Sequence, residues 1–498
     1  MHILMATSEA VPFAKTGGLA DVCGALPVEL RRLGHQVSLI MPAYRHIHAS
    51  GQRIHPTDVR FSIPIGNKTV TGGLLQSTLP DSDVPVYFVS QDEYFDRAEL
   101  YREDGVDYID NSERFVFFCR AVIEAIELLD LEVDVLHAND WPTGLIPAYL
   151  KTEYAGVPPY EQIASLLTIH NLAYQGQFWH WDMLLTGLDW KYFNWHQMEF
   201  YGNLNLMKTG IVFADAITTV SPQYAEEIQS APLGCGLEGV LQSRRDVLSG
   251  VINGVDYRVW DPSVDSHIAA QFSPETVGEG KPACKTALQQ TLGLPTVADV
   301  PLIGFIGRLA DQKGLDLIVG MIHHWPASQP AQFALLGTGD PHYHETLTRL
   351  AAEQPERIAV RLEFSNALAH QMEAGLDMFL MPSRYEPCGL NQLYSLRYGT
   401  VPIVHATGGL LDTVTNSTEE TLADGTATGF QIFDYSVNAL DEATQRACAL
   451  YHQPSRWRAL METGMKQDWS WARSAAQYAS LYERIAARRR QQTIGSRR

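Results

Sequence analysis

Short apolar runs, each followed by polar residues and then a segment of helical periodicity, recur along the chain. The run 3–6 predicts a buried strand, and six apolar residues then recur at helical spacing: Leu19, Val22, Cys23, Leu26, Leu30 and Leu33. Gly34 is expected to end that helix. The first half predicts further strands at 37–40, 84–89, 133–137, 166–170 and 216–220, with a helix at 115–129. The second half predicts strands at 302–306, 333–336, 358–362, 378–381 and 401–404.

Strands that end in polar loops before helices predict a parallel, doubly wound sheet in each half. A chain of 498 residues is also too long for one ordinary core. We therefore expect an α/β protein of two Rossmann-like domains facing a deep interdomain cleft. The expected ranges are 1–260 for the N-terminal domain, 261–475 for the C-terminal domain and 476–498 for a C-terminal helix or tail that packs on the first domain. The segment 261–279, with its Pro, Ser and Gly, is the predicted connection.

Charge and cysteine usage narrow the function classes. The formal net charge of -20 argues against nucleic acid and acidic membranes as partners. Six scattered cysteines contain no CxxC pair, which indicates neither a zinc site nor a disulfide framework and fits a cytoplasmic protein. The sequence runs straight into the first predicted strand, so no leader is expected, and no apolar run reaches membrane-spanning length. The basic residues at 488–498 are predicted to form a frayed tail.

The loop between the first predicted strand and the first predicted helix contains Lys15-Thr16-Gly17-Gly18. Glycines let a ligand approach the backbone, and a helix start offers unpaired N–H groups and the positive end of a dipole. A lysine adds a full charge, so the loop suits the phosphates of a nucleotide. The alternative is an ordinary tight turn with a solvated lysine.

Two loops of the second half offer matching chemistry. Arg308 and Lys313 share one strand-to-helix loop, and with Lys15 they could form a diphosphate clamp. The alternative is that they are ordinary surface charges. Glu386-Pro387-Cys388-Gly389-Leu390 is predicted to open a helix running to about residue 398. Glu386 could then hold sugar hydroxyls or stabilise a cationic transition state, or be only a helix-end charge. Gly408-Gly409 repeats the phosphate-friendly pattern.

Other polar and aromatic positions favour structural interpretations. His170 ends a strand, where a hydrogen-bonded structural role is common, and Asp140 is expected to cap a helix rather than line a cleft. The aromatic-rich segment 179–201 favours core or interdomain packing over sugar binding. Asp81-Ser82-Asp83 matches the DxD pattern of a metal-binding carboxylate pair, but it precedes a strand and is predicted to be a turn.

Several long motifs, in order across nearly all of the chain, resemble bacterial glycogen synthases and plant starch synthases of glycosyltransferase family 5. These motifs are KTGGLADV at 15–22, HANDWPTGL at 137–145, HNLAYQG at 170–176, VSPQYAEEI at 220–228, GLEGVL at 236–241, NGVD at 253–256, GRLADQKG at 307–314 and SRYEPCGLNQLYSLRYGT at 383–400.

The resemblance implies the GT-B fold and transfer of glucose from ADP-glucose to the non-reducing end of an α-1,4-glucan. It implies retention of configuration, no cofactor and no metal. The residues implied as catalytic are Glu386, Arg308, Lys313, His170 and Asp140. Those implied to bind ADP-glucose are Lys15, Gly17, Gly18, Asp21, Asn253, Cys388, Gly389, Leu390, Gly408 and Gly409.

The chain departs from the family pattern at three places. The family often has His-Asp-Trp-His where this chain has Asn139-Asp140-Trp141-Pro142. Related retaining enzymes have a second glutamate at the position of Tyr394. Many bacterial members have Thr at the position of Asn391. The route to retention, the glucan preference and the oligomeric state stay open. The alternatives are another GT-B enzyme that uses UDP-glucose or a different acceptor, a phosphorylase, or a glucan-binding protein without activity. A dinucleotide oxidoreductase is disfavoured because no full GxGxxG follows a strand.

Overall fold

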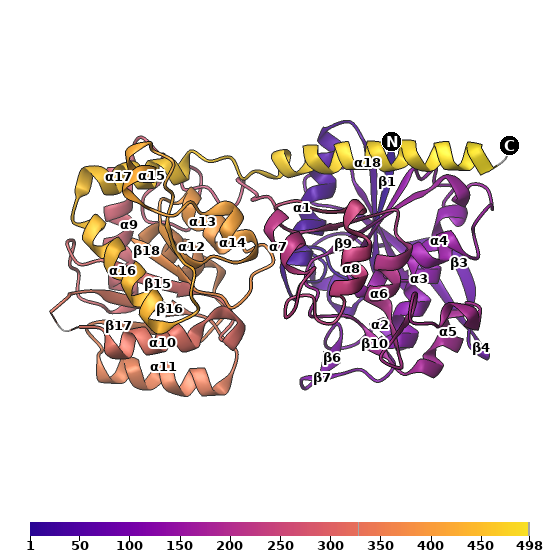
Figure 1. Ribbon diagram of the computed structural model, residues 1–498, viewed down its shortest axis with the longest axis horizontal. Helices are drawn as coiled ribbons and strands as arrows, with labels where there is room; N and C mark the ends of the chain where they lie inside the picture. The colour runs from indigo at the N-terminus through magenta and orange to yellow at the C-terminus, as the bar shows by residue number, and fades with distance from the viewer. Residues whose placement is uncertain (327, 497–498) are drawn as a thin grey trace. The chain divides into compact units, whose positions relative to one another are not determined.

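The computed structural model describes residues 1–326 and 328–496 and divides into two compact units. One unit joins Met1–Gly254 to the C-terminal segment from Trp471, and the other is Val255–Ser470 (Figure 1). The chain thus passes between the units at 254–255 and again at 470–471. The segment 261–279, predicted to be the connection, lies inside the second unit, so that prediction is wrong.

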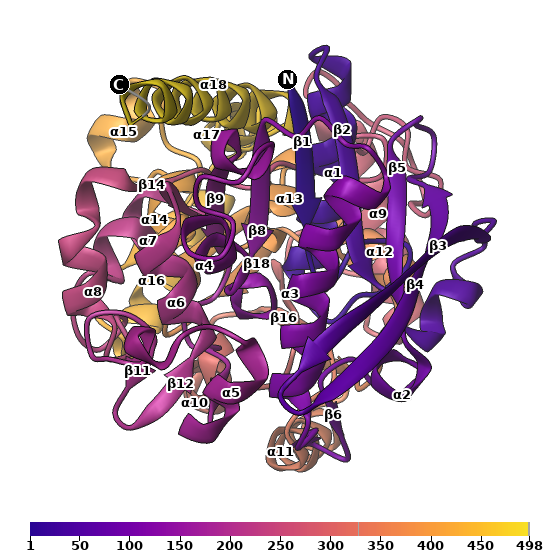
Figure 2. The same ribbon diagram turned by 90° about the vertical axis from the view of Figure 1, so that its right-hand side faces the viewer.

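The first unit is built on a nine-stranded sheet in the order β14-β13-β9-β8-β1-β2-β5-β4-β3 (Figure 2). Seven strands are parallel: β1 (His2–Ala6), β2 (Gln36–Pro42), β5 (Pro85–Ser90), β8 (Val135–Asn139), β9 (Ala164–Ile169), β13 (Ala216–Thr219) and β14 (Leu248–Gly250). Strand β1 lies between β2 and β8, so the chain reverses its direction of winding there. In open α/β sheets, such a switch point collects loops at the carboxyl ends of the strands.

An antiparallel hairpin of β3 (His55–Ile65) and β4 (Lys68–Thr78) extends the sheet beyond β5. This hairpin was not predicted from the sequence. Gly66, which has φ of +60° in the tight turn before Lys68, is the signal that could have found it. The Asp81-Ser82-Asp83 segment forms the next turn, as predicted.

Helices cover the first sheet and bury its apolar faces. The helices are α1 (Gly18–Arg32), α2 (Asp92–Phe95), α3 (Asn111–Leu128), α4 (Ile146–Lys151), α5 (Met183–Thr186), α6 (Leu206–Phe213), α7 (Pro222–Glu227), α8 (Glu238–Ser243) and α18 (Trp471–Ser496). Helix α1 buries Leu19, Val22, Cys23, Leu26 and Leu30, whereas Leu33 is exposed because the helix has ended. A small antiparallel sheet joins β10 (Gln177–Phe178), β12 (Asn203–Asn205) and β11 (Glu199–Phe200).

The long helix α18 packs on the first unit, beside α1. Tyr482 Oη lies 2.8 Å from His137 Nδ1, a buried pair that joins α18 to β8. Arg489 donates to the carbonyl of Glu161, and Arg490 pairs with Asp134. The prediction of a frayed tail from 488 is therefore wrong as far as residue 496; residues 497 and 498 lie outside the described residues.

The second unit holds a six-stranded parallel sheet in the order β17-β16-β15-β18-β19-β20. Its strands are β15 (Leu302–Ile306), β16 (Gln332–Leu336), β17 (Ile358–Arg361), β18 (Met378–Met381), β19 (Val401–His405) and β20 (Phe430–Ile432). The switch point lies between β15 and β18, which are the two strands that precede Arg308 and Glu386.

The helices of the second unit are α9 (Val277–Leu292), α10 (Leu315–His324), α11 (Pro341–Glu353), α12 (Asn366–Gly375), α13 (Asn391–Arg397), α14 (Gly408–Thr413), α15 (Glu419–Ala423), α16 (Val437–Tyr451) and α17 (Pro454–Met465). Among the described residues of both units, no helix combines the length and the apolar character that crossing a bilayer requires.

Candidate active site

Glu9 organises the loop between β1 and α1. Its buried carboxylate accepts hydrogen bonds from the Thr16 amide (2.5 Å), the Thr16 hydroxyl (2.6 Å), the Gly17 amide (3.2 Å) and the Tyr101 hydroxyl (2.7 Å). Four donors on one carboxylate fix the loop conformation. Local sequence patterns do not reveal this role of Glu9, because the donors come from other parts of the chain.

Lys15 and the two glycines stand at the surface of this loop. Lys15 Nζ lies 2.6 Å from Asp21 Oδ1, and the lysine side chain is half-exposed. Gly17 is the N-cap of α1, and a Cβ added to Gly17 or Gly18 would meet nothing within 4 Å. The backbone is therefore open to a ligand. The Gly17 amide, however, already donates to Glu9, so the prediction of unpaired N–H groups does not hold for that residue.

Asp140 follows β8, the strand next to β1 at the switch point. Its backbone has φ of +56°, and its carboxylate accepts from the His170 amide at 2.7 Å. Asp140 is the N-cap residue of the short 3-10 helix Trp141–Thr143, as its position predicted, but its side chain makes no capping hydrogen bond, so a capping role of the carboxylate is wrong. Burial raises the pKa of Asp140 to about 7, against the lowering effect of the backbone donors of His170 and Asn171.

His170 is buried and held by Asn139. Its Nε2 lies 3.0 Å from Asn139 Oδ1, while Asn139 Nδ2 donates to the carbonyl of Ala6. This arrangement orients the amide oxygen toward the ring, so Nε2 carries the proton and Nδ1 is left as an acceptor. Burial lowers the pKa of His170 to about 3, and the ring is therefore neutral at physiological pH. Asn253, beyond β14, is buried with no hydrogen-bond partner for Oδ1 within the described chain.

Lys313 and Glu386 meet at the switch point of the second unit. Lys313 Nζ lies 2.6 Å from Glu386 Oε2, and the Ser383 hydroxyl donates to the same oxygen at 3.0 Å. The carboxylate is 8% exposed and the lysine 23%, so the pair is far better shielded than a surface ion pair. Both residues follow predicted strands, but no local pattern predicts their contact.

Arg308 lies on the same loop as Lys313 but points elsewhere. Its guanidinium donates to Gln312 Oε1 at 3.0 Å and is exposed. Gln312 in turn lies against the segment before Glu386, because the Arg384 amide donates to the Gln312 carbonyl. The two strand-end loops are thereby joined through the backbone.

The Glu386–Leu390 segment is a loop rather than the start of a helix. Helix α13 begins at Asn391 with Leu390 as its N-cap, so the predicted helix opening at Glu386 is wrong. Gly389 has φ of +75°, which favours glycine and turns the chain before α13. The side chain of Cys388 is buried in this loop.

Gly408 and Gly409 begin α14 and pack against this loop. Gly409 N donates to the carbonyl of Glu386 at 3.1 Å. A Cβ on Gly408 would collide with the Glu386 carbonyl, and one on Gly409 with the Cys388 carbonyl. The glycine pair therefore holds the backbone of Glu386 in place, besides any contact that it makes with a ligand.

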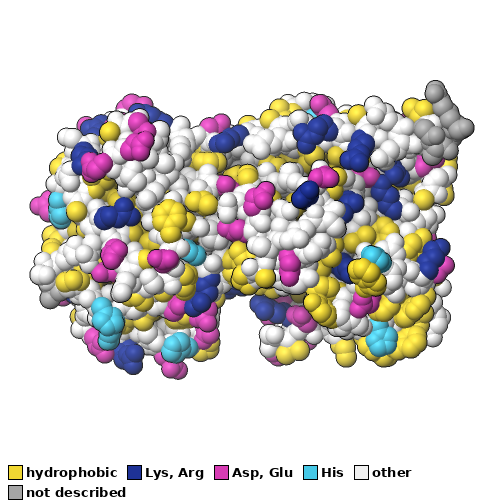
Figure 3. Space-filling view, in the orientation of Figure 1, with side chains coloured by type: hydrophobic (Ala, Val, Ile, Leu, Met, Phe, Trp, Pro, Cys, Tyr) yellow, Lys and Arg dark blue, Asp and Glu magenta, His cyan; other side chains and the backbone are white. Residues whose placement is uncertain are grey.

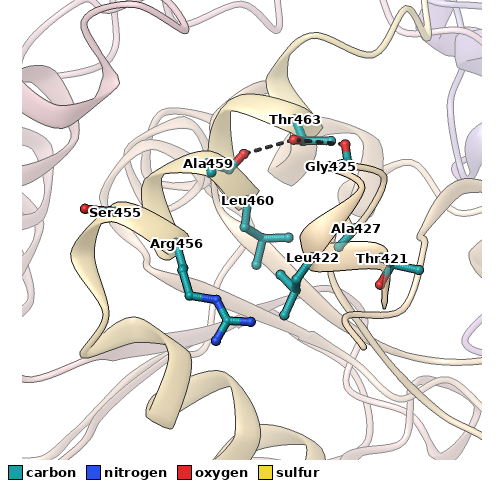
Figure 4. A pocket seen from close by; sticks show the side chains of 9 residues that line it. All are labelled: Thr421, Leu422, Gly425, Ala427, Ser455, Arg456, Ala459, Leu460 and Thr463. Atoms are coloured by element: carbon teal, nitrogen blue, oxygen red, sulfur yellow. Dashed lines mark hydrogen bonds between the residues drawn. The ribbon is translucent and has the colours of Figure 1, made fainter. Parts of the chain in front are cut away.

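None of these residues lines the pocket drawn in Figure 4. That pocket lies between α15 and α17, where it is bordered by Thr421, Leu422, Arg456, Leu460 and Thr463. The described residues also contain no group of three or more His, Cys, Asp or Glu with the geometry of a metal site.

Family models match both units. The model described as the starch synthase catalytic domain matches residues 2–243, and that of the group 1 glycosyl transferases matches 294–459. A glycogen synthase of Rhodopirellula baltica is 48% identical over 100% of both chains, and one of Syntrophotalea carbinolica is 46% identical over 97% of this chain and 99% of its own. The chain belongs to the glycogen and starch synthase family.

The similarity to this family extends to a solved three-dimensional structure. The catalytic domain of starch synthase IV from Arabidopsis thaliana, bound to ADP and acarbose, is 31% identical with a TM-score of 0.88 and covers 98% of this chain and 99% of its own. Sucrose-phosphate synthase from Thermosynechococcus elongatus, at 17% identity and a TM-score of 0.58, shares the fold. The fold is GT-B, and the protein is a retaining glycosyltransferase of glycogen or starch synthesis.

Proposed function

We propose that this family member transfers glucose from ADP-glucose to the non-reducing end of an α-1,4-glucan and uses cationic side chains instead of a metal ion. The shielded contact of Lys313 with Glu386 at a strand switch point carries the proposal. The related starch synthase IV binds ADP and acarbose, which supports the choice of an adenine nucleotide and a glucan-like acceptor.

The departing diphosphate is the first chemical problem of this transfer. As the glycosidic bond to phosphate breaks, negative charge accumulates on ADP and must be stabilised. Arg308 and Lys313 hold the diphosphate, and Lys15 with Gly17 and Gly18 binds the nucleotide. Asp21 positions Lys15 through their 2.6 Å ion pair. As the bond breaks, the Lys313 ammonium group interacts less with Glu386 and more with the negative charge that develops on the diphosphate.

Positive charge on the sugar is the second problem. The transition state of glucosyl transfer has oxocarbenium character, and the carboxylate of Glu386 would stabilise it or hold the glucose hydroxyls. Cys388, Gly389 and Leu390 would present their backbone to the donor sugar, and Gly408-Gly409 would approach its phosphate. Asp140, Asn253 and the Nδ1 acceptor of His170 would accept hydrogen bonds from glucose hydroxyls.

The contacts of Glu386 favour one route to retention. Both Lys313 and Ser383 donate to Oε2, which lowers the nucleophilicity of that oxygen. Tyr394, at the position of a second glutamate in related enzymes, is stacked on Trp260 at 4.0 Å and supplies no carboxylate. We infer that the acceptor hydroxyl attacks from the face that ADP leaves, without a covalent intermediate on the enzyme.

The state of the cysteines supports a cytoplasmic location for this enzyme. All six lie in the described part of the chain and form no disulfide, and five of them are buried. Free cysteines are typical of a reducing compartment, so we infer the cytoplasm. Cell fractionation with a tagged chain tests this inference.

A donor panel tests the function itself. Purified protein is incubated with glycogen and EDTA, and with either ADP-glucose or UDP-glucose. We expect chain elongation from ADP-glucose at a rate that EDTA leaves unchanged. Elongation only from UDP-glucose would assign a different donor, and loss of activity on chelation that is restored by a divalent ion would overturn the metal-independent proposal.

A further inference from the structure

The aromatic segment after His170 lies largely at the surface instead of in a core. Four tryptophans are exposed: Trp179 (62%), Trp181 (48%), Trp190 (42%) and Trp195 (70%). Within the described chain, these are the only tryptophans among the exposed large hydrophobic residues. Exposed apolar side chains that gather in one region usually mark a binding surface. Core packing, one of the two alternatives predicted for this segment, is therefore wrong for these four side chains, and interdomain packing stays a prediction.

Three of the exposed rings form a continuous surface together with Phe193. Trp181 and Trp190 have ring centroids 5.5 Å apart and an interplanar angle of 36°, and Trp190 lies 5.0 Å from Phe193 at 34°. Trp179 meets Trp181 edge-on at 6.4 Å. We call Trp179, Trp181, Trp190 and Phe193 the tryptophan platform. Hydrophobic and histidine side chains gather in this part of the face in Figure 3, where Figure 1 has α5.

The backbone beneath the tryptophan platform is well anchored. Met183 and Thr186 of α5 are fully buried. The carbonyl of Thr186 accepts hydrogen bonds from the Arg120 side chain and, at 3.0 Å, from the Tyr149 hydroxyl. An anchored backbone leaves less motion for a ligand to restrict, which lowers the ordering entropy that binding costs.

The tryptophan platform continues from the strand-end site of the first unit. Phe178, the residue before Trp179, lies 5.7 Å from Trp141, which directly follows Asp140. Gly176 approaches the same Trp141 ring so closely that a Cβ would collide with it. The residues that lead into the tryptophan platform thus pack on Trp141, the neighbour of Asp140 in the proposed glucose-binding set.

We propose that the tryptophan platform is a second binding surface for an α-glucan chain, at which the polymer is held by glucose units remote from the reacting end. This goes beyond the proposed function, although its ligand is the acceptor polymer of that function. The C–H faces of pyranose rings are apolar and stack on indole rings, while hydroxyls around the ring need polar partners. Asp182, Asp189 and Lys191 interleave with the rings and can supply such partners.

Charge favours a neutral polymer over other occupants. Residues 177–197 contain two acidic residues and one lysine, so the segment offers no cationic cluster for a membrane or a polyanion. A chain with a net charge of -20 would also repel an acidic partner, whereas an uncharged glucan meets no such penalty.

The test separates polymer binding from catalysis. Trp181 and Trp190 are replaced together by Ala, and mobility is measured in native gels that contain glycogen or amylose. We expect wild type to be retarded and the double variant to bind the polymer about tenfold more weakly, because clustered aromatic anchors dominate such surfaces. KM for glycogen should rise by a similar factor, while kcat and the KM values for ADP-glucose and maltotriose stay unchanged.

Two further variants serve as controls. Leu33→Ala removes an exposed apolar side chain at the C-cap of α1, which is not part of the tryptophan platform, and should leave retardation unchanged. Replacing Trp181 and Trp190 by Phe keeps aromatic faces and should restore most of the binding. Melting temperatures confirm that the variants fold.

Undiminished retardation of the double Ala variant, or an equal loss in Leu33→Ala, would overturn the proposal. Light scattering provides a further test. If the wild type is a dimer, and the double Ala variant is a monomer that binds glucan as well as the wild type, the tryptophan platform binds a second copy of the chain and the proposal is overturned. Retardation needs no turnover. An inactive protein that is still retarded would therefore contradict the proposed function and leave this inference standing.

Discussion

Lys313 Nζ lies 2.6 Å from Glu386 Oε2, and this contact joins the loops that follow two neighbouring strands, β15 and β18. The carboxylate is also bound by Ser383, so its position depends on both loops. A lysine on a shielded carboxylate balances the charge of that carboxylate and lies where it can meet a diphosphate.

We predict that Lys313→Ala lowers kcat by about 10²- to 10³-fold, because the developing charge on ADP loses a preorganised cation. Glu386→Gln should lower kcat by a comparable factor with a smaller change in KM. Steady-state kinetics with ADP-glucose and glycogen measure both. Lys466→Ala, which removes an exposed lysine paired with Glu462, is the matched control and should keep wild-type kinetics. A Lys313→Ala enzyme with wild-type kcat would contradict the assigned role.

The Glu9 carboxylate gives a second prediction, since it acts through the loop that it holds. Glu9→Gln keeps the size of the side chain but removes the charge that binds Thr16, Gly17 and Tyr101. We expect the free energy of unfolding to fall by about 2 kcal/mol and KM for ADP-glucose to rise more than kcat falls. Urea titration and kinetics measure the two effects. Glu29→Gln alters another glutamate of the first unit, one that pairs with Arg32 at the surface of α1, and should change neither.

Asp140 gives a prediction about pH. Burial raises its pKa to about 7, so the folded protein ionises this carboxyl as pH rises from 6 to 8. If the carboxylate binds a glucose hydroxyl, kcat/KM rises with pH across a midpoint near 7. Asp140→Asn should abolish this titration and lower activity at pH 8. A midpoint that persists in Asp140→Asn would assign the titration to another group. His170 does not provide it, because burial lowers its pKa to about 3.

The same pKa shifts predict how stability changes with pH. Folded Asp140 keeps a proton that the unfolded chain releases at about pH 4, so its contribution to stability falls as pH rises from 4 to 7. His170 acts in the opposite direction. The unfolded chain gains a proton on this histidine below about pH 6.5, and stability is lost as pH falls toward 3. Urea midpoints of wild type and Asp140→Asn should therefore converge as pH is lowered from 7 to 5.

Gly408 and Gly425 form a matched pair for testing backbone support of Glu386. Both have positive φ, +45° and +74°, so Ala imposes conformational strain at either position. Only at Gly408 would the added Cβ strike the Glu386 carbonyl; at Gly425 it meets nothing within 4 Å. We expect Gly408→Ala to lower kcat at least about tenfold, because small displacements of a catalytic group are costly. Gly425→Ala should lower stability slightly and leave kcat unchanged. Equal effects on kcat would refute the positioning role.

Local patterns determined much of the fold. Apolar runs and helical periodicity were sufficient for strands such as 302–306 and 378–381, which the structure reproduces residue for residue. They worked because parallel strands are buried on both faces and are therefore continuously apolar. The hairpin β3–β4 escaped detection, since an edge hairpin has one face exposed and alternates apolar with polar residues. The Glu386 helix start was misplaced because the positive φ of Gly389 delays the helix to Asn391.

By itself, the sequence determined the parallel α/β architecture, the strand-end location of the candidate residues and, through its motifs, the family. These depend on neighbours along the chain. Only the tertiary structure decided that Glu9 holds the Lys15 loop, that Lys313 meets Glu386, that the Asp140 carboxylate binds the His170 amide instead of capping a helix, and that four tryptophans face solvent. Each of these is a contact, or the absence of one, between segments that sheet order and helix packing bring together, and no local periodicity records which side chains then meet.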